Sequence, residues 1–150
     1  TPLLVFSREY TSWTRDEKAA GIWQRIMEGI QAQQPGNAPI SWEDTEPDIE
    51  FVRTAPDGSI WILNSRAMWA PPEGVFTYYD VFNQAGEFVE QVNVICEGSA
   101  REDFLLFAGD QRVFRITDFW DAVMARFGGA GEPDDESEAE PMSVICYEIR

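Results

Sequence analysis

The chain of 150 residues is 44% hydrophobic and 13% aromatic, and it contains six tryptophans. This composition excludes a chain that is disordered throughout and predicts a single domain with a sizeable core over residues 1–150. The 11 basic and 27 acidic residues give a net charge of −16. This charge disfavours binding to nucleic acid or to an anionic membrane surface, and it also keeps a protein in solution without any partner.

The residue types available for catalysis are restricted, because the sequence has no histidine and only two cysteines, Cys96 and Cys146. Histidine is the commonest general base and metal ligand, and two thiolates are too few for a four-thiolate zinc site. We therefore predict no cofactor and no metal ion. The two cysteines are expected to be buried free thiols, with a disulfide between them as the alternative. No apolar run is long enough to span a bilayer, and no signal peptide is visible.

The first elements in chain order are a strand over residues 3–9 and a helical insert over residues 14–34. Thr14 and Glu17 have the spacing of a capping box, in which each side chain binds a backbone N–H group at the start of a helix. We expect the apolar face of this helix to pack against a sheet, with docking of a partner as the alternative. The face consists of Ala19, Ile22, Trp23, Ile26, Met27 and Ile30.

The middle of the chain predicts one antiparallel meander of four strands. The strands are expected at residues 48–55, 59–65, 75–82 and 87–96, with turn-forming residues between them.

The pattern then restarts with strands at residues 103–108 and 111–117. A short helix and an acidic flexible loop are expected over residues 118–141, followed by a last strand at residues 142–150.

A short internal repeat occurs three times in the chain. In each copy an apolar residue is followed, seven positions later, by a tryptophan. The matched pairs are Phe6 and Trp13, Ile62 and Trp69, and Val113 and Trp120, and the polar residue two positions after each first member is Arg8, Asn64 or Arg115. We align residues 77–82 with residues 145–150 as the third strands of the two units. The second unit then lacks a fourth strand. The copy of the repeat at residues 6–13 lacks a first strand. A rival alignment matches residues 94–96 with residues 144–146.

Tandem four-stranded meanders of this kind resemble blades of a β-propeller. Residues 56–62 (PDGSIWI) and 79–89 (YDVFNQAGEFV) are similar to the blade pattern of bacterial six-bladed propellers with NHL-like repeats. The resemblance implies an all-β fold with helical insertions, a partial β-propeller of about two and a half blades from the C-terminal part of a longer chain. It also implies a bacterial periplasmic or extracellular protein. An unpaired last strand would permit association between copies.

In such blades the predicted inserts all follow the second strand of a unit, so we expect them to gather on one face of the propeller. Side chains near those strand ends are the candidates for binding a ligand or partner: Arg8, Asn64, Arg66, Trp69, Arg115 and Trp120. The arginines could recognise a carboxylate through planar two-point contacts, or they could pair with the chain's own acidic residues. Trp42, Trp61 and Trp69 could stack on a sugar or peptide, or serve in the core.

The sequence therefore favours a non-catalytic binding or scaffold module that presents the insert-bearing face to a protein or a small ligand. The alternative is a metal-assisted hydrolase or lyase that acts at the propeller channel through carboxylates. A third hypothesis is an assembly role, in which incomplete blades are completed between copies of the chain.

Overall fold

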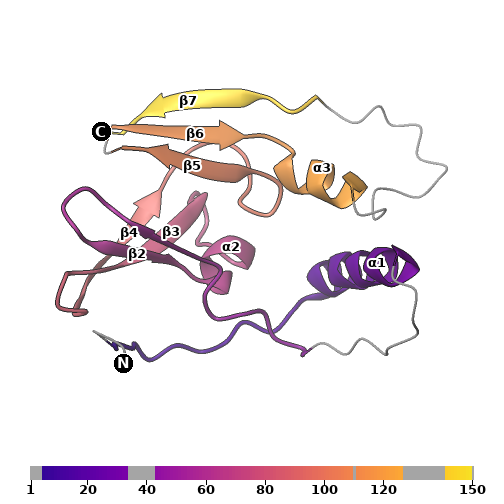
Figure 1. Ribbon diagram of the computed structural model, residues 1–150, viewed down its shortest axis with the longest axis horizontal. Helices are drawn as coiled ribbons and strands as arrows, with labels where there is room; N and C mark the ends of the chain where they lie inside the picture. Colours follow the sequence, from indigo (N-terminus) through magenta and orange to yellow (C-terminus); the bar gives the residue numbers. More distant parts are fainter. Residues whose placement is uncertain (1–4, 34–42, 110, 127–140, 150) are drawn as a thin grey trace.

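The computed structural model describes residues 5–33, 43–109, 111–126 and 141–149 (Figure 1). Within these residues the fold is mostly β, with two antiparallel sheets of four and three strands; α1 precedes the first sheet, and α2 and α3 each follow the second strand of a sheet. The elements are α1 (Glu17–Gln33), β1 (Phe51–Thr54), β2 (Ile60–Leu63), α2 (Ser65–Trp69), β3 (Thr77–Phe82), β4 (Phe88–Val94), β5 (Phe104–Ala108), β6 (Arg112–Ile116), α3 (Phe119–Arg126) and β7 (Val144–Glu148).

The first sheet is the meander that the sequence predicts, with the order β1-β2-β3-β4. Each strand is shorter than predicted, because the terminal residues belong to turns and loops or, as at Asn64 and Ser65, to the start of α2. At the β1–β2 turn Gly58 has a φ of +82°, and the backbone N–H of Ser59 donates to the carboxylate of Asp57. Glycine suits this position because other residues pay a steric cost at positive φ.

The second sheet has the order β5-β6-β7, so the last strand lies beside β6 as the third strand of its unit. This position contradicts the rival alignment, which made the last strand the equivalent of β4. The residue alignment is nevertheless wrong by one position. Ile62 lies opposite Asp80 and Val113 lies opposite Tyr147, so Tyr147 matches Asp80 rather than Tyr79.

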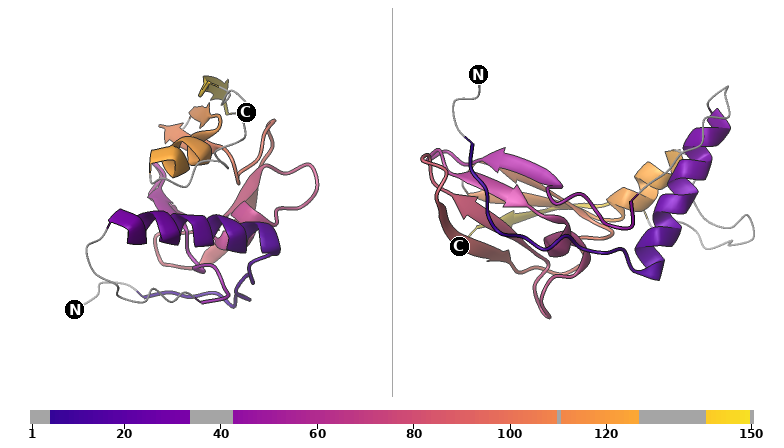
Figure 2. Two further views of the ribbon diagram at one scale, coloured as in Figure 1. Left: turned by 90° about the vertical axis from the view of Figure 1, so that its right-hand side faces the viewer. Right: turned by 90° about the horizontal axis from the view of Figure 1, so that it is seen from below.

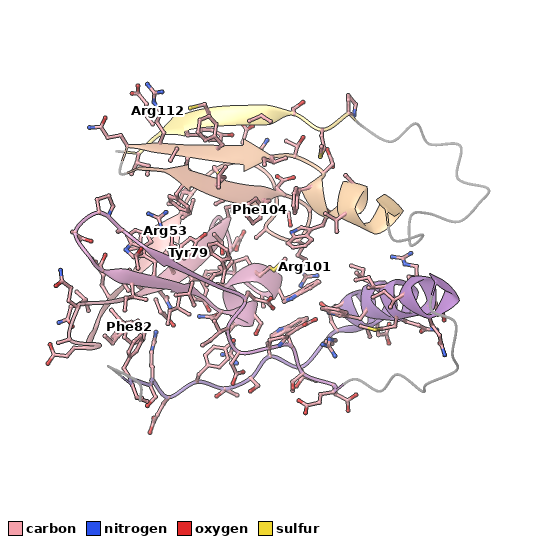
Figure 3. All side chains as sticks on the ribbon, viewed as in Figure 1. Arg53, Tyr79, Phe82, Arg101, Phe104 and Arg112 are labelled. Carbon is pink, nitrogen blue, oxygen red and sulfur yellow. The ribbon has the colours of Figure 1, made fainter. Side chains whose placement is uncertain are left out.

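The two sheets face each other, and aromatic side chains fill the space between them. The ring of Phe107 on β5 contacts Trp61 and Tyr79, with centroids 6.3 and 5.6 Å apart. The guanidinium of Arg53 lies 3.8 Å from the centroid of the Phe107 ring. Figure 3 shows Arg53 and Tyr79 in this space. Burial raises the pKa of Tyr79 to about 12, so the phenol stays neutral at physiological pH. Trp61 is partly buried, and its ring packs against Tyr79 and Phe107 between the sheets.

Residues 5–13 cross the other face of the first sheet, as the view from below shows (Figure 2). The ring of Phe6 contacts that of Phe82 at 4.9 Å. Residues 5–9 form no strand, so the predicted strand over residues 3–9 is wrong for its described part. The segment contacts the sheet through side chains and, among the described residues, has no strand beside it for ladder hydrogen bonds.

Helices α1, α2 and α3 lie at the same end of the two sheets (Figures 1 and 2). Helices α1 and α3 belong to the predicted inserts, and their common location agrees with the expectation that the inserts gather together; α2 was not predicted. The helix of the first insert begins later than its predicted cap. Asp16 rather than Thr14 caps it, since the Asp16 Oδ1 accepts from the backbone N–H of Ala19 at 2.8 Å.

The packing predicted for α1 is wrong. Among the described side chains of α1, Ala19 in the first turn is the only one that is buried. The other apolar residues of the predicted face are partly exposed. The helix projects beyond the strand ends instead of lying on a sheet (Figure 1).

Some predictions fall outside the described residues, namely most of the acidic loop (residues 127–140) and Trp42. Within the described part of the chain, no helix combines the length and the hydropathy needed to cross a membrane. The four- and three-stranded sheets do not by themselves close a propeller ring.

Candidate functional site: a cavity at the helix-bearing end

A cavity of about 110 Å³ lies between the two sheets at the end where the helices gather. Its walls come from both sheets and from α2 and α3, so the arrangement of the whole fold is needed to form it. The apolar lining consists mainly of Phe51, Leu63, Met68, Phe76, Phe104 and Trp120. The polar residues of the lining are Glu50, Thr77, Tyr79 and Asp103. Mostly apolar walls with a few polar groups are typical of sites for small ligands.

Glu50 immediately precedes β1 and has a carboxyl group with an unusual proton affinity. Burial, and secondly the nearby charge of Glu46, raise the pKa of Glu50 to about 7. Arg15 and a hydrogen bond from the side chain of Trp69 act in the opposite direction. The carboxyl of Glu50 is therefore about half-ionised near neutral pH. At such a pH a bound ligand can change the charge of this carboxyl.

The neighbouring carboxylate of Glu46 is fully engaged by other side chains. It is 3% exposed and accepts hydrogen bonds from Arg15 Nε at 2.8 Å and from the indole N–H of Trp23. The Arg15 Nη2 group adds a second bond at 3.2 Å. The Arg15–Glu46 pair ties the start of α1 to the segment that precedes β1.

Asp103 brings the second carboxylate to the cavity, and Arg115 holds it there. Arg115 Nε lies 3.6 Å from the Asp103 Oδ2 atom. The same guanidinium donates to the carbonyl of Glu97, and the backbone N–H of Asp118 donates to the Asp103 Oδ1 atom at 3.1 Å. Arg115 is only 8% exposed, so it acts as an internal counter-ion to Asp103.

Two of the predicted site residues, Arg8 and Asn64, meet at the carboxylate of Asp80. Arg8 forms an ion pair with Asp80, and its guanidinium lies 4.1 Å from the centroid of the Phe88 ring. The Asn64 amide donates to Asp80 at 3.2 Å, while its Oδ1 atom caps α2 by accepting from the Ala67 backbone.

The predicted arginines thus bind groups of their own chain. Arg8 pairs with Asp80, Arg115 pairs with Asp103, and the exposed Arg66 donates to the carbonyl of Thr11 at 2.9 Å. Arg8 and Arg115 fit the alternative interpretation, in which the arginines pair with the chain's own acidic residues, whereas Arg66 bonds to a backbone carbonyl. The structure does not bring Arg8, Arg66 and Arg115 together into a shared rim.

The predicted tryptophans lie closer to the cavity. Trp120 on α3 lines it directly. Trp69 at the end of α2 is 7% exposed and stacks on Trp13. Through its hydrogen bond to Glu50, Trp69 supports the cavity wall from behind.

The sequence analysis did not single out Glu50, Asp103 or Arg101. Arg101 Nε donates to the carbonyl of Trp69 at 2.8 Å, and its Nη2 group lies 3.2 Å from the carboxylate of Asp16. These three residues stand in acid-rich or loop segments without a distinctive spacing, so no local pattern separates them from solvated charges. An acidic residue next to an apolar strand, as in the run Glu50-Phe51, was the only available signal.

Metal ligands and thiols are the remaining reactive groups of the described residues. No group of three or more His, Cys, Asp or Glu side chains is arranged there to hold a metal ion. Both cysteines are free. Cys146 is exposed, which corrects the expectation that both thiols are buried, and Cys96 is half-buried. Burial raises the pKa of the Cys96 thiol.

A second hollow, of about 430 Å³, lies at the turns between β1 and β2 and between β3 and β4. Its walls are turn residues such as Asp57 and Gln84, which already bond to neighbours in the turns. Figure 1 places these turns at the end of the sheets opposite to the helices.

Comparison with known proteins adds no family assignment, since no family model, no curated protein and no solved structure matches the chain.

Proposed function

We propose that this chain is a non-catalytic binding module that uses its helix-bearing end to recognise a protein or a small ligand. One observation carries the proposal: the three described helices and the cavity between the sheets lie at the same end of the molecule. Inserts that gather at one end of a rigid sheet scaffold are a common way to build a binding surface. The partly exposed apolar face of α1 enlarges the surface available to a partner.

The architecture that we propose for this module is part of a β-propeller, with the two sheets as neighbouring blades. The meander order of β1-β2-β3-β4 and the shorter β5-β6-β7 unit support this interpretation. The edge-on contact between the Trp61 and Phe107 rings, which joins the two sheets, is of the kind that packs one blade on the next. The proposal retains the expectation of a bacterial periplasmic or extracellular protein.

The binding proposal is tested by a fragment screen of the ¹⁵N-labelled chain by NMR. Fragments are expected to shift the indole N–H resonance of Trp120 and the signals of neighbouring cavity residues. Replacement of Trp120 by leucine should abolish these shifts, whereas Gln84→Ala at the opposite end should leave them unchanged. Binding that maps only to the β1–β2 and β3–β4 turns, or no reproducible binding, would overturn the proposal.

We also propose that copies of the chain associate through the second sheet. Strand β7 is an edge strand among the described residues, and Leu106 and Val144 on the outer face are 51% and 67% exposed. Exposed edges and apolar faces favour association. Light scattering over a range of concentrations should show a dimer that Leu106→Lys weakens. A monomer at all concentrations would contradict this part of the proposal.

A further inference from the structure

We propose that the cavity between the two sheets binds a small organic cation, an ammonium group, between the carboxylate of Glu50 and the ring of Trp120. This inference rests on the proposed function, because it assigns a ligand class to the same helix-bearing end. It depends on the size of the cavity, on its charge and on the chemistry of its walls.

The size of the cavity limits the ligand to a small group. An apolar cavity of about 150 Å³ takes benzene in another protein, whereas this cavity measures about 110 Å³. It therefore accommodates an ammonium nitrogen with a few methyl groups, and a larger ligand would insert only such a group. The acidic residues Glu50 and Asp103 in the wall are suited to orient it, whereas the Thr77 hydroxyl donates to the carbonyl of Ala67 at 2.9 Å.

The charge of the cavity favours a single positive charge. Asp103 is paired with Arg115, and Arg15, the cation that acts on Glu50 through space, is bonded to Glu46. Within the described residues Glu50 has no ion-pair partner of its own. Of the two acidic residues that line the cavity, Asp103 is paired with Arg115 and Glu50 is not, so an ionised Glu50 attracts a cation and repels an anion.

The aromatic walls supply the second attraction. Phe51, Phe76, Phe104 and Trp120 line the cavity together with Tyr79. Figure 3 shows the side chain of Phe104, the first residue of β5, on the side of the sheets where the helices lie. Aromatic faces attract cations through the ring quadrupole, and several rings around one site are the usual means of recognising methylated ammonium groups. The net charge of −16 raises the local concentration of any cationic ligand.

The probe for the test is tetramethylammonium chloride, titrated at constant ionic strength into the ¹⁵N-labelled chain. The matched probes are tert-butanol, which has a similar shape but no charge, and pivalate, which carries a negative charge. Tetramethylammonium should shift the Trp120 indole resonance saturably and bind about tenfold more tightly than tert-butanol, whereas pivalate should not bind. Equal binding of the neutral and cationic probes would overturn the inference.

Variants assign the contacts. Glu50→Gln should weaken tetramethylammonium binding about tenfold, whereas Glu90→Gln, the same change on the exposed strand β4, should not alter it. Unchanged binding by a folded Glu50→Gln variant would overturn the role of this carboxylate.

The pH dependence of the wild-type chain is a further test that needs no substitution. Affinity should rise between pH 6 and pH 8 as Glu50 ionises beside Glu46 and Arg15, while Asp103 stays paired with Arg115. An affinity that is independent of pH would count against Glu50.

The same titrations separate this inference from the proposed function. If neutral or anionic fragments occupy the cavity while tetramethylammonium does not, the ligand class is wrong and the binding function stands. If no probe and no fragment of any charge reaches the helix-bearing end, both proposals fail.

Discussion

Trp13 and Trp69, which occupy the same position in two copies of the sequence repeat, stack on each other with ring centroids 5.5 Å apart and an angle of 6° between the rings. Equivalent tryptophans of two copies of the repeat are therefore in direct contact. The guanidinium of Arg101, 5.5 Å from the centroid of the Trp69 ring, adds a cation–π contact to this stack. The stack connects the segment before α1 to the end of α2, next to the cavity wall.

This contact predicts that Trp13→Ala destabilises the fold. Loss of the partly buried ring should cost about 2 kcal/mol, less than for a fully buried tryptophan. Urea unfolding followed by circular dichroism measures the change. Trp13→Phe, which keeps an aromatic ring on Trp69, should recover at least half of the loss. Equal stability of Trp13→Ala and the wild type would show that the stack contributes nothing.

The raised pKa of Glu50 predicts a stability that depends on pH. The folded chain holds the Glu50 proton with a pKa of about 7, against an ordinary value of 4.5. A pKa raised by folding means that the stabilising contribution of the protonated form is lost as the pH rises from 4.5 through 7.

Glu50→Gln should therefore be more stable than the wild type at pH 8. We expect a gain of about 1 kcal/mol, because the carboxyl is only partly buried and solvent screens it. The gain should shrink toward pH 5, and urea unfolding across this range measures it. A gain that stays constant with pH would show that the charge of Glu50 is not its source.

Gly98 is expected to tolerate no side chain. Its φ is +95°, and an added Cβ would collide with the carboxylate of Asp103 and lie 2.6 Å from Arg115 Nη1. Gly98→Ala should cost about 3 kcal/mol, from backbone strain together with disturbance of the ion pair. The matched control is Gly74→Ala, where φ is +77° but nothing lies within 4 Å of the added atom. That variant should lose only about 1 kcal/mol. Equal losses in thermal or urea unfolding would contradict the collision.

The two cysteines should differ in reactivity. Cys146 is exposed, whereas Cys96 is half-buried and burial raises the pKa of its thiol. Thiolate is the reactive form, so an alkylating agent at pH 7.5 should modify Cys146 several-fold faster than Cys96. Mass spectrometry of the time course measures both rates, and the single variants Cys96→Ser and Cys146→Ser assign them. Faster modification of Cys96 would contradict the exposure of these two sites.

The sequence by itself determined the β class of the fold, most of the strands and the order of the first meander. These features follow from local signals: apolar and β-branched runs, turn residues such as Asp57-Gly58, and the tryptophan repeat. The helical spacing of α1 was also correctly predicted, because an amphipathic period is visible in one segment. Two predictions that needed a neighbour in space were wrong, namely the strand over residues 3–9 in its described part and the burial of the α1 face.

Only the tertiary structure decided the candidate site. Glu50 and Asp103 are 53 positions apart in the sequence, and they share a cavity because the two sheets pack face to face. The pairing of Arg8 with Asp80 and of Arg115 with Asp103 was likewise set by packing, since the long-range partner of a charge leaves no periodic mark in a sequence. Local sequence selects the elements, whereas desolvation and charge pairing arise only where distant elements meet.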